Sequence, residues 1–343
     1  MIEVSNGLSH VWKCWIAENK MLGADDATLL QVLVENGFDE VEAMRELAAA
    51  AAHPYFQAGQ WMAQRVNKLE AMAEVRRSLS LLSPKNAAVD RRRGLSRQEF
   101  LDNYYSANRP VVLVDAMRDW QALSLWTPEY LKAKCGNELV EIMSDRDSDP
   151  LYQVNSQLHK TRIRFSDFVD MVLRGPSNDF YLQANNAFFD KESLQWMADH
   201  IQIFPEYLDP SRPQGTVFFW FGPAGTVTPL HHDKQNILFA QVSGRKRITL
   251  VSPDQSHLLY NDIGVFSQVD CEDPDYEAYP LFESVTPMAV TLHPGEALFI
   301  PVGWWHHVRA LDICINVSFL NFVFPNNYEI PDVYIEREAG EDS

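Results

Sequence analysis

The segment VFFWFGPAGTVTPLHHDKQNILFAQVSGRKRITLVS, residues 217–252, decides the fold of this chain. It contains three short runs rich in β-branched and aromatic residues, at 217–222, 237–242 and 247–252, and each is followed by a turn with Gly, Pro or Ser. Short runs of this kind are typical of strands in a barrel or jelly roll. Further strand-like runs lie at 110–115, 289–293, 297–302 and 313–322, and helical patterns lie at about 128–135, 166–174 and 191–200. We therefore expect a mainly β fold, a jelly-roll barrel with helices packed outside it.

The N-terminal region, residues 1–85, is instead rich in Ala, Leu, Met and Glu and is expected to be helical. Asp26 is expected to cap a helix that ends at Asn36-Gly37, because Asp favours the N-cap and Asn-Gly favours a left-handed stop. A longer helix is expected over 55–82. Its apolar stripe, which the spacing predicts to pack into a core, contains Trp61, Leu69 and Met72.

The residues between the helices and the barrel predict a domain boundary. Residues 86–94 contain three consecutive arginines, Arg91 to Arg93, and are interpreted as a solvated linker. Ser96 and Glu99 form an S-x-x-E capping box that opens a helix through about Ser106. The barrel domain is expected over 95–325, and the last residues, 326–343, are expected to form an acidic tail.

Composition excludes several classes of protein. Hydrophobic residues make up 46% and charged residues 22%, which predicts a folded chain, and 29 basic against 47 acidic residues give a net charge of −18. That charge disfavours nucleic acid as a partner. No run approaches the ~18 apolar residues of a membrane span and no signal-peptide pattern opens the sequence, so we expect a cytoplasmic protein. The four scattered cysteines are expected to be reduced.

Two histidine-containing segments predict a metal site. In TPLHHDKQN, residues 228–236, His231 and Asp233 are two residues apart and point to the same side of an extended chain. The segment PGEALFIPVGWWHHV, residues 294–308, provides a buried strand that leads into His306 and His307. Two histidines and one carboxylate leave positions open on an octahedral metal, as non-haem Fe(II) oxygenases require. An H-x-D pair alone is usually structural, and zinc-dependent hydrolysis is the other metal chemistry that an open site allows.

These segments resemble the JmjC-type, cupin-like 2-oxoglutarate oxygenases, especially the small hydroxylases of protein side chains. The similarity runs from about Leu95 to Phe322. The matching motifs are NRPVVLVDAMRDWQALSLW, FYLQ at 180–183, WFGPAGTVTPLHHD, QVSGRKRITLVSP, SQVDCEDPD at 267–275 and PGEALFIPVGWWHHVRALD. The resemblance implies a double-stranded β-helix that uses Fe(II), 2-oxoglutarate and O2 and releases succinate and CO2.

The resemblance also implies a role for individual residues. It places His231, Asp233 and His306 on the iron, with His307 facing away. Lys246 matches the lysine that binds the far carboxylate of 2-oxoglutarate, and the hydroxyls of Thr228 and Tyr181 match those that assist it. Asn236 also matches a cosubstrate contact, although it follows His231 by five residues where relatives have six.

Substrate contacts are predicted at the mouth of the site. Glu141 matches the acidic residue with which arginine-hydroxylating relatives bind a guanidinium, and an exposed strand glutamate is the alternative. Gln183 and Trp220 are expected near the entrance, with Asn185 and Asn186 beside them.

Three functions are compatible with the sequence. The first is hydroxylation of a C–H bond in a protein or peptide side chain, with arginine favoured because an acidic surface attracts a basic partner. The second is hydroxylation of a small metabolite or an RNA base, and the third is a non-catalytic interaction or sensing module. A homodimer is common among the similar proteins.

Overall fold

The computed structural model describes residues 8–183, 188–211 and 215–334. These residues form two compact units. The first ends at Ser78, and the second runs from Leu79 to Tyr334. Asn185 and Asn186, as well as the acidic residues after 334, lie outside the described residues.

The first unit is a helical bundle with a small apolar core. Its helices are α1 (His10–Met21), α2 (Asp26–Glu35), α3 (Glu40–Ala52) and α4 (Pro54–Leu81), of which the last three residues belong to the second unit. The core contains Leu8, Ile16, Leu29, Leu33, Ala43 and Leu47. The cap of α2 is Asp25 and not Asp26, because the Asp25 carboxylate accepts the Thr28 N–H at 2.9 Å. Gly37 follows α2 with a φ of 88°, as the Asn-Gly stop predicts.

Helix α4 differs from the expectation for its apolar stripe. Trp61, Leu69 and Met72 were expected to pack into a core, but they are 67%, 70% and 55% exposed. Within the described part of α4, Phe56 alone is buried. The helical spacing therefore predicts the helix correctly. Spacing alone does not predict whether other side chains cover the apolar stripe.

The second unit contains two main β-sheets. The larger has the strand order β1-β2-β11-β7-β13-β5, and the smaller has the order β10-β8-β12-β6. The strands of the larger sheet are β1 (Asp90–Arg92), β2 (Val111–Leu113), β5 (Val217–Gly222), β7 (Ile237–Ser243), β11 (Ala297–Ile300) and β13 (Cys314–Phe319). Those of the smaller are β6 (Val227–His232), β8 (Lys246–Val251), β10 (Met288–Leu292) and β12 (Trp305–Ala310). Two short pairs complete the unit: β3 (Leu139–Met143) with β4 (Lys160–Arg164), and β9 (Ile263–Gly264) with β14 (Val333–Tyr334).

Alternate residues of the large sheet face two different layers, as the two-residue period of a strand requires. On β7, Leu238 and Ala240 belong to the core shared with the helices, whereas Phe239 faces the core shared with the small sheet. The small sheet contributes Ile248 and Leu250 to that second core. The expected jelly-roll, a double-stranded β-helix, is therefore confirmed.

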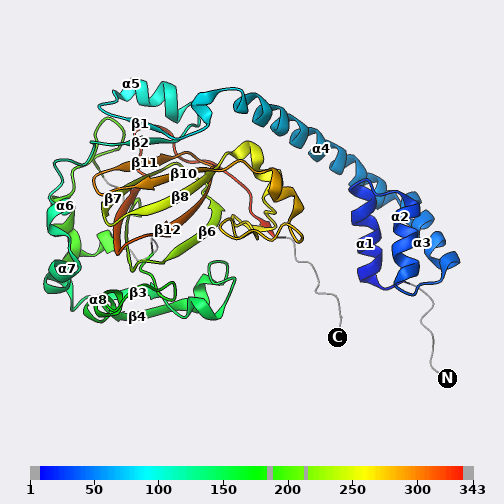
Figure 1. Ribbon diagram of the computed structural model, residues 1–343, viewed down its shortest axis with the longest axis horizontal. Helices are drawn as coiled ribbons and strands as arrows, with labels where there is room; N and C mark the ends of the chain where they lie inside the picture. The colour runs from blue at the N-terminus through cyan, green and yellow to red at the C-terminus, as the bar shows by residue number, and fades with distance from the viewer. Residues whose placement is uncertain (1–7, 184–187, 212–214, 335–343) are drawn as a thin grey trace. The chain divides into compact units, whose positions relative to one another are not determined.

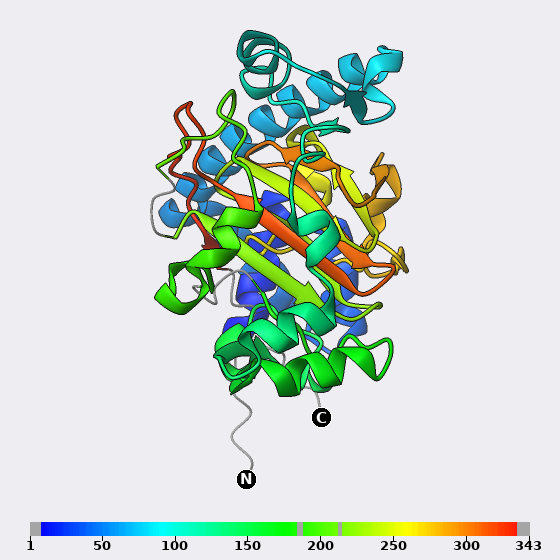
Figure 2. The ribbon, with the colours of Figure 1, turned by 90° about the vertical axis from the view of Figure 1, so that its left-hand side faces the viewer.

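Helices cover the outside of the barrel (Figure 1), and Figure 2 views it from the side on which α6, α7 and α8 lie. They are α5 (Arg97–Phe100), α6 (Ala122–Leu125), α7 (Pro128–Cys135) and α8 (Phe165–Leu173), with the π-helix η2 (Leu101–Tyr105) and the 3-10 helices η1 (Pro84–Asn86), η3 (Arg146–Ser148), η4 (Ser156–His159), η6 (Phe188–Asp190), η7 (Glu192–His200), η8 (Pro253–Leu258) and η9 (Pro280–Ser284). The predicted capping box between Ser96 and Glu99 forms at the start of α5. In the part of the chain that the structure describes, no helix is both long and apolar enough to cross a membrane. All four cysteines have free thiols.

Two of the expected boundaries differ from the structure. The segment 86–94, interpreted as a linker, contains β1, which pairs in parallel with β2, and Arg91 forms an ion pair with Glu296. The segment from 326, interpreted as a tail, begins with Asn326 bonded to Asn236 and reaches β14 before the described residues end. The charged composition of both segments suggested that they are solvated. Instead, backbone pairing of β1 with β2 holds the first segment on the barrel, and the Asn326 amide holds the second.

Candidate metal centre and cosubstrate cavity

Strands β6 and β12 hold the histidines of the site side by side. His231 pairs with His306, but Thr228 pairs with Val308, so Pro229 and Leu230 lie opposite the single residue His307. This β-bulge adds one residue to β6 and turns its side chains. Thr228 and His231 are three residues apart, yet both line the same cavity because of the bulge.

Three side chains at one end of this pair form a cluster that can hold a metal ion. Each of His231, Asp233 and His306 offers one ligand atom, and these atoms lie within 4.8 Å of one another. The His306 Nε2 atom is 3.4 Å from Asp233 Oδ2, and the two imidazole centroids are 4.1 Å apart. His232 packs against Trp305 instead, with ring centroids 4.7 Å apart.

Backbone carbonyls orient both imidazoles. The Nδ1 atom of His231 is 2.8 Å from the Pro229 oxygen, and that of His306 is 3.0 Å from the Trp304 oxygen. A carbonyl oxygen can only accept, so each Nδ1 carries the proton and each Nε2 keeps its lone pair. Such bonds from the second nitrogen fix the tautomer of a metal-binding histidine.

The protonation states suit a divalent metal. Burial and the neighbouring His306 lower the pKa of His231 to about 4, so that its imidazole is neutral at pH 7. Burial alone would raise the pKa of Asp233, but the neighbouring His306 lowers it below its usual value. Two imidazoles and one carboxylate are the donor set of non-haem Fe(II), so these residues fit the ion that the fold implies.

A cavity of about 310 Å³ lies beside this cluster, and Lys246 is at its inner end. The lysine is 2% exposed, and its Nζ donates to the Tyr181 hydroxyl at 2.8 Å and to the Asn316 amide oxygen at 2.7 Å. Across residues 8–183, 188–211 and 215–334, no carboxylate forms an ion pair with it. Because a buried cation without an anion is costly, Lys246 is well placed to bind the carboxylate of a ligand.

The cavity thus has two chemically different ends. His306 pairs with Leu250 of β8, whereas Lys246 pairs with Ala310, four residues further along β12. The metal ligands are therefore at one end, Lys246 with the Tyr181 hydroxyl is at the other, and Thr228 lines the wall. A short dicarboxylate with a keto group, such as 2-oxoglutarate, matches that arrangement, since one end chelates metal and the other needs a cation. The cavity therefore fits the cosubstrate.

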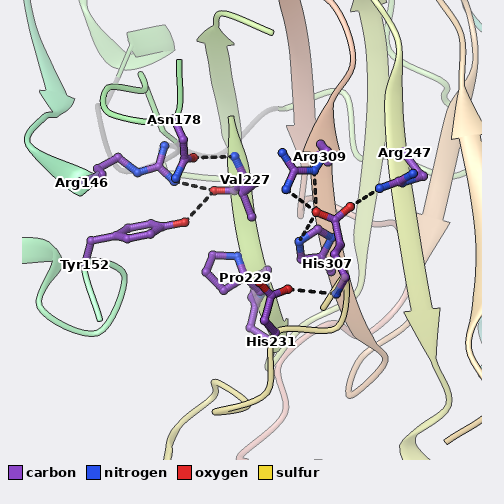
Figure 3. A network of polar contacts seen from close by, with 11 residues as sticks. Arg146, Tyr152, Asn178, Val227, Pro229, His231, Arg247, His307 and Arg309 are labelled. Atoms are coloured by element: carbon purple, nitrogen blue, oxygen red, sulfur yellow. Dashed lines mark hydrogen bonds and ion pairs between the residues drawn. The ribbon is translucent and has the colours of Figure 1, made fainter. Parts of the chain in front are cut away.

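Polar side chains hold the outer edge of β6, which is the edge strand of its sheet (Figure 3). The Val227 oxygen accepts from Arg146 Nη2 at 2.5 Å and from the Tyr152 hydroxyl at 3.1 Å. The Val227 N–H donates to Asn178 Oδ1 at 2.8 Å. These three bonds fix the residue that immediately precedes Thr228.

A second network lies on the opposite side of β12 from the metal cluster. Arg309 Nε donates to Glu272 Oε2 at 2.5 Å, Arg247 also pairs with Glu272, and His307 Nε2 is 3.8 Å from the same carboxylate. Figure 3 shows Arg247, Arg309 and His307 pointing toward one another on this side. His307 therefore faces away from the cavity, and Arg247 is part of an ion-pair network.

The predicted substrate and cosubstrate residues lie in different places. Gln183 and Trp220 line the metal cavity. Glu141 lines a separate cavity of about 50 Å³ and pairs with Lys160 at 3.2 Å. Asn236, expected beside the cosubstrate, does not line the metal cavity.

The Asn236 amide is used in structural bonds instead. Its Oδ1 accepts the Val302 N–H at 2.8 Å, and its Nδ2 donates to Asn326 Oδ1 at 3.0 Å. The spacing of five residues after His231 places Asn236 directly before β7, beside Asn326 of the C-terminal segment. The structure thus does not support a cosubstrate role for Asn236.

Several residues of the site had no sequence signal. Gln153 lines the metal cavity and hydrogen-bonds Gln183 at 3.1 Å, and Phe266 packs on His231 with ring centroids 5.7 Å apart. Both come from irregular segments, where periodicity gives no information. Phe266 immediately precedes the motif SQVDCEDPD, and this neighbouring motif is the one sequence feature that points to a place for Phe266 near the site.

Comparison with known proteins agrees with this geometry. The family model described as cupin-like domain matches residues 96–327. Lysine-specific demethylase 8 of Xenopus tropicalis is 34% identical over 65% of this chain and 50% of its own, and lysine-specific demethylase JMJ30 of Arabidopsis thaliana is 34% identical over 67% and 54%. The tRNA wybutosine-synthesizing protein 5 of Gallus gallus is 28% identical over 71% of this chain and 80% of its own.

The chain spans about half the length of the first two of these relatives. The matched region is the barrel, with β6, β12 and the cavity that they line. JmjC domains use Fe(II), 2-oxoglutarate and O2, and the cluster and the cavity described above suit all three. The chain therefore belongs to the cupin-like JmjC-domain family.

Proposed function

We propose that this protein is an Fe(II)- and 2-oxoglutarate-dependent oxygenase that hydroxylates a C–H bond in a protein or peptide side chain. The observation that carries the proposal is the placement of two sites on one cavity. The cluster of His231, Asp233 and His306 lies at one end, and the buried Lys246 lies at the other. A non-catalytic module would not need both.

The residues of the cavity have separate tasks in this reaction. Bound Fe(II) supplies the oxidative chemistry, in which one atom of O2 enters the substrate C–H bond and the other enters succinate, with release of CO2 from 2-oxoglutarate. Lys246 and Tyr181 bind the far carboxylate and so set the direction of the cosubstrate. The apolar side chains of Phe239, Ile300 and Val308 line the cavity and exclude water from the reacting atoms.

Arginine is the favoured target within this class. The net charge of −18 attracts a basic partner, and the small cavity lined by Glu141 shares Gln153 and Gln183 with the metal cavity. An arginine bound there would take over part of the ion pair that Glu141 makes with Lys160. Relatives named lysine-specific demethylases also support a protein substrate.

Hydroxylation of an RNA base is the second candidate. It is favoured by the tRNA wybutosine-synthesizing protein 5, of which this chain covers 80%. The acidic surface opposes it, because a phosphate backbone would be repelled.

Mass spectrometry of treated cell extracts tests the proposal. The protein would be incubated with Fe(II), 2-oxoglutarate and lysate, with the His306→Ala variant as the control. We expect peptides that gain the mass of one oxygen atom on a side chain, with arginine most frequent. Oxygen gained on RNA or small molecules but not on peptides would support the second candidate, and no gain over the control would contradict both.

A further inference from the structure

Arg146 is a second buried cation close to the cosubstrate end of the cavity. It is 1% exposed and begins η3, where its N–H donates to the Asp179 oxygen at 3.2 Å. None of the carboxylates in the described part of the chain forms an ion pair with its guanidinium. Arginine does not lose its proton in proteins, so this charge stays in the interior.

The guanidinium has few hydrogen-bond partners. Nη2 donates to the Val227 oxygen, whereas Nε and Nη1 have no acceptor among the described residues. The group lies 4.3 Å from the centroid of the Tyr152 ring and 5.6 Å from that of Tyr181. One carbonyl and two aromatic faces offset only part of the cost of burying a charge.

Tyr181 connects this arginine to the cosubstrate. Lys246 Nζ lies 5.4 Å from the centroid of the same ring and donates to its hydroxyl. Two buried cations thus share one tyrosine, and no carboxylate among the described residues forms an ion pair with either of them, so the far carboxylate of 2-oxoglutarate could pair with both. In addition, the bond from Arg146 to Val227 holds β6 just before Thr228, the other hydroxyl predicted to contact the cosubstrate.

We propose that Arg146 is a positioning residue for 2-oxoglutarate, which fixes Tyr181 and Thr228 beside the ligand and adds a second positive charge behind Lys246. The inference rests on the proposed function. It attributes to Arg146 a preference for the dicarboxylate over a monocarboxylate of equal length, because only the dicarboxylate places a charge at this end.

Calorimetric titration of the Mn(II)-loaded protein with two ligands tests the inference. One ligand is 2-oxoglutarate, and the other is 2-oxopentanoate, which has a methyl group where 2-oxoglutarate has its far carboxylate. We expect Arg146→Met to weaken 2-oxoglutarate binding about tenfold or more, and 2-oxopentanoate binding less than about threefold. Arg146→Lys keeps the positive charge but loses the planar guanidinium. Its affinity for 2-oxoglutarate should therefore lie between those of Arg146→Met and the parent.

The matched control is Arg97→Met, since Arg97 also places a guanidinium over an aromatic ring, 5.3 Å from Phe324, but on an exposed helix. It should bind both ligands like the parent. Equal loss of both ligands in Arg146→Met, or unchanged affinity for 2-oxoglutarate, would overturn the inference and leave the proposed function standing. Failure of the parent protein to bind 2-oxoglutarate would overturn both.

Discussion

Burial acts in different ways on the charged and titratable side chains of the cavity. Desolvation favours the neutral imidazole of His231 and so prepares it to bind metal. The neighbouring His306 lowers the pKa of Asp233 despite burial, which favours its carboxylate form. Lys246 is buried with two neutral partners and no carboxylate in the described ranges, which leaves its charge available to a ligand.

Replacement of Lys246 by Met should therefore act on the cosubstrate. Loss of a buried charge-assisted contact costs about 2 to 5 kcal/mol, which corresponds to an increase of roughly 30-fold or more in the KM for 2-oxoglutarate. Steady-state kinetics at varied 2-oxoglutarate would measure it, with Lys132→Met, at an exposed ion pair with Asp170, as the control. An unchanged KM would show that the carboxylate binds elsewhere.

At this scale, the sequence predicts the place of a residue where a motif fixes its position. His231, His306 and Lys246 stand in strands whose alternation determines their direction, and Asp233 directly follows β6. Asn236 could not be placed in this way, because it lies at a strand start and its partner Asn326 is ninety residues away in sequence. Arg146 had no signal, since its burial depends on contacts with β6 and Tyr181.

At the scale of elements, a close approach between β5 and the segment that carries Tyr181 shapes the cosubstrate end. A Cβ atom on Gly222 would lie 2.6 Å from Tyr181 Cδ2, closer than packed atoms allow. The glycine at the end of β5 thus makes room for the ring whose hydroxyl contacts Lys246.

Gly222→Ala should displace that ring and raise the KM for 2-oxoglutarate about tenfold, a loss of about 1.4 kcal/mol. Gly59→Ala is the control, because the added methyl would meet only the flexible end of Met21. Both variants would be compared in 2-oxoglutarate titrations. A KM unchanged in Gly222→Ala would mean that the Tyr181 ring can shift without loss of the carboxylate contact.

The Glu272 network joins the segment after β9 to β8 and β12, and it should make stability depend on pH. Burial alone would raise the pKa of Glu272, but Arg309 and Arg247 lower it to about 2 from 4.5. Since the unfolded chain binds the proton more readily, this contribution is present above about pH 4.5 and is lost as pH falls toward 2.

Glu272→Gln should cost about 2 kcal/mol of unfolding free energy at pH 7. The difference from the parent should shrink between pH 5 and pH 3, as the parent carboxylate loses its advantage. Urea unfolding at a series of pH values would measure both proteins. A difference that stays constant with pH would contradict the assigned role of the carboxylate.

Sequence patterns identified most elements but not all their partners. The strands at 217–222, 237–242 and 313–322 were found because hydrophobic runs and turns alternate there. Strand β1 was missed because Asp90–Arg92 is polar and gains its order from pairing with β2. The bulge in β6 was also missed, since it depends on the register with β12.

At the scale of the whole molecule, the chain combines the barrel that holds the proposed iron site with a separate helical unit. Deletion of residues 1–78 should leave 2-oxoglutarate turnover without substrate within about twofold of the parent, because the cavity residues all belong to the second unit. Solubility or substrate engagement should be impaired. Unchanged solubility and substrate turnover in the truncated protein would reject a role for the helices.

The expected homodimer and cytoplasmic location remain predictions. Exposed apolar residues on α4, such as Trp61 and Leu69, give the helical unit a surface that a second copy could cover. Sedimentation of the full chain and of the Leu69→Glu variant would test this, with a monomeric full chain as the contradicting result. Cell fractionation would test the location.

The central claim is that His231, Asp233 and His306 form an iron site that turns over 2-oxoglutarate. Succinate formation with Fe(II) and O2, measured for the parent, His306→Ala and His307→Ala, tests it most directly. We predict turnover by the parent, none above background in His306→Ala, and turnover within about tenfold of the parent in His307→Ala, whose imidazole faces Glu272. Equal succinate formation by the parent and His306→Ala, or none by the parent, would contradict the claim.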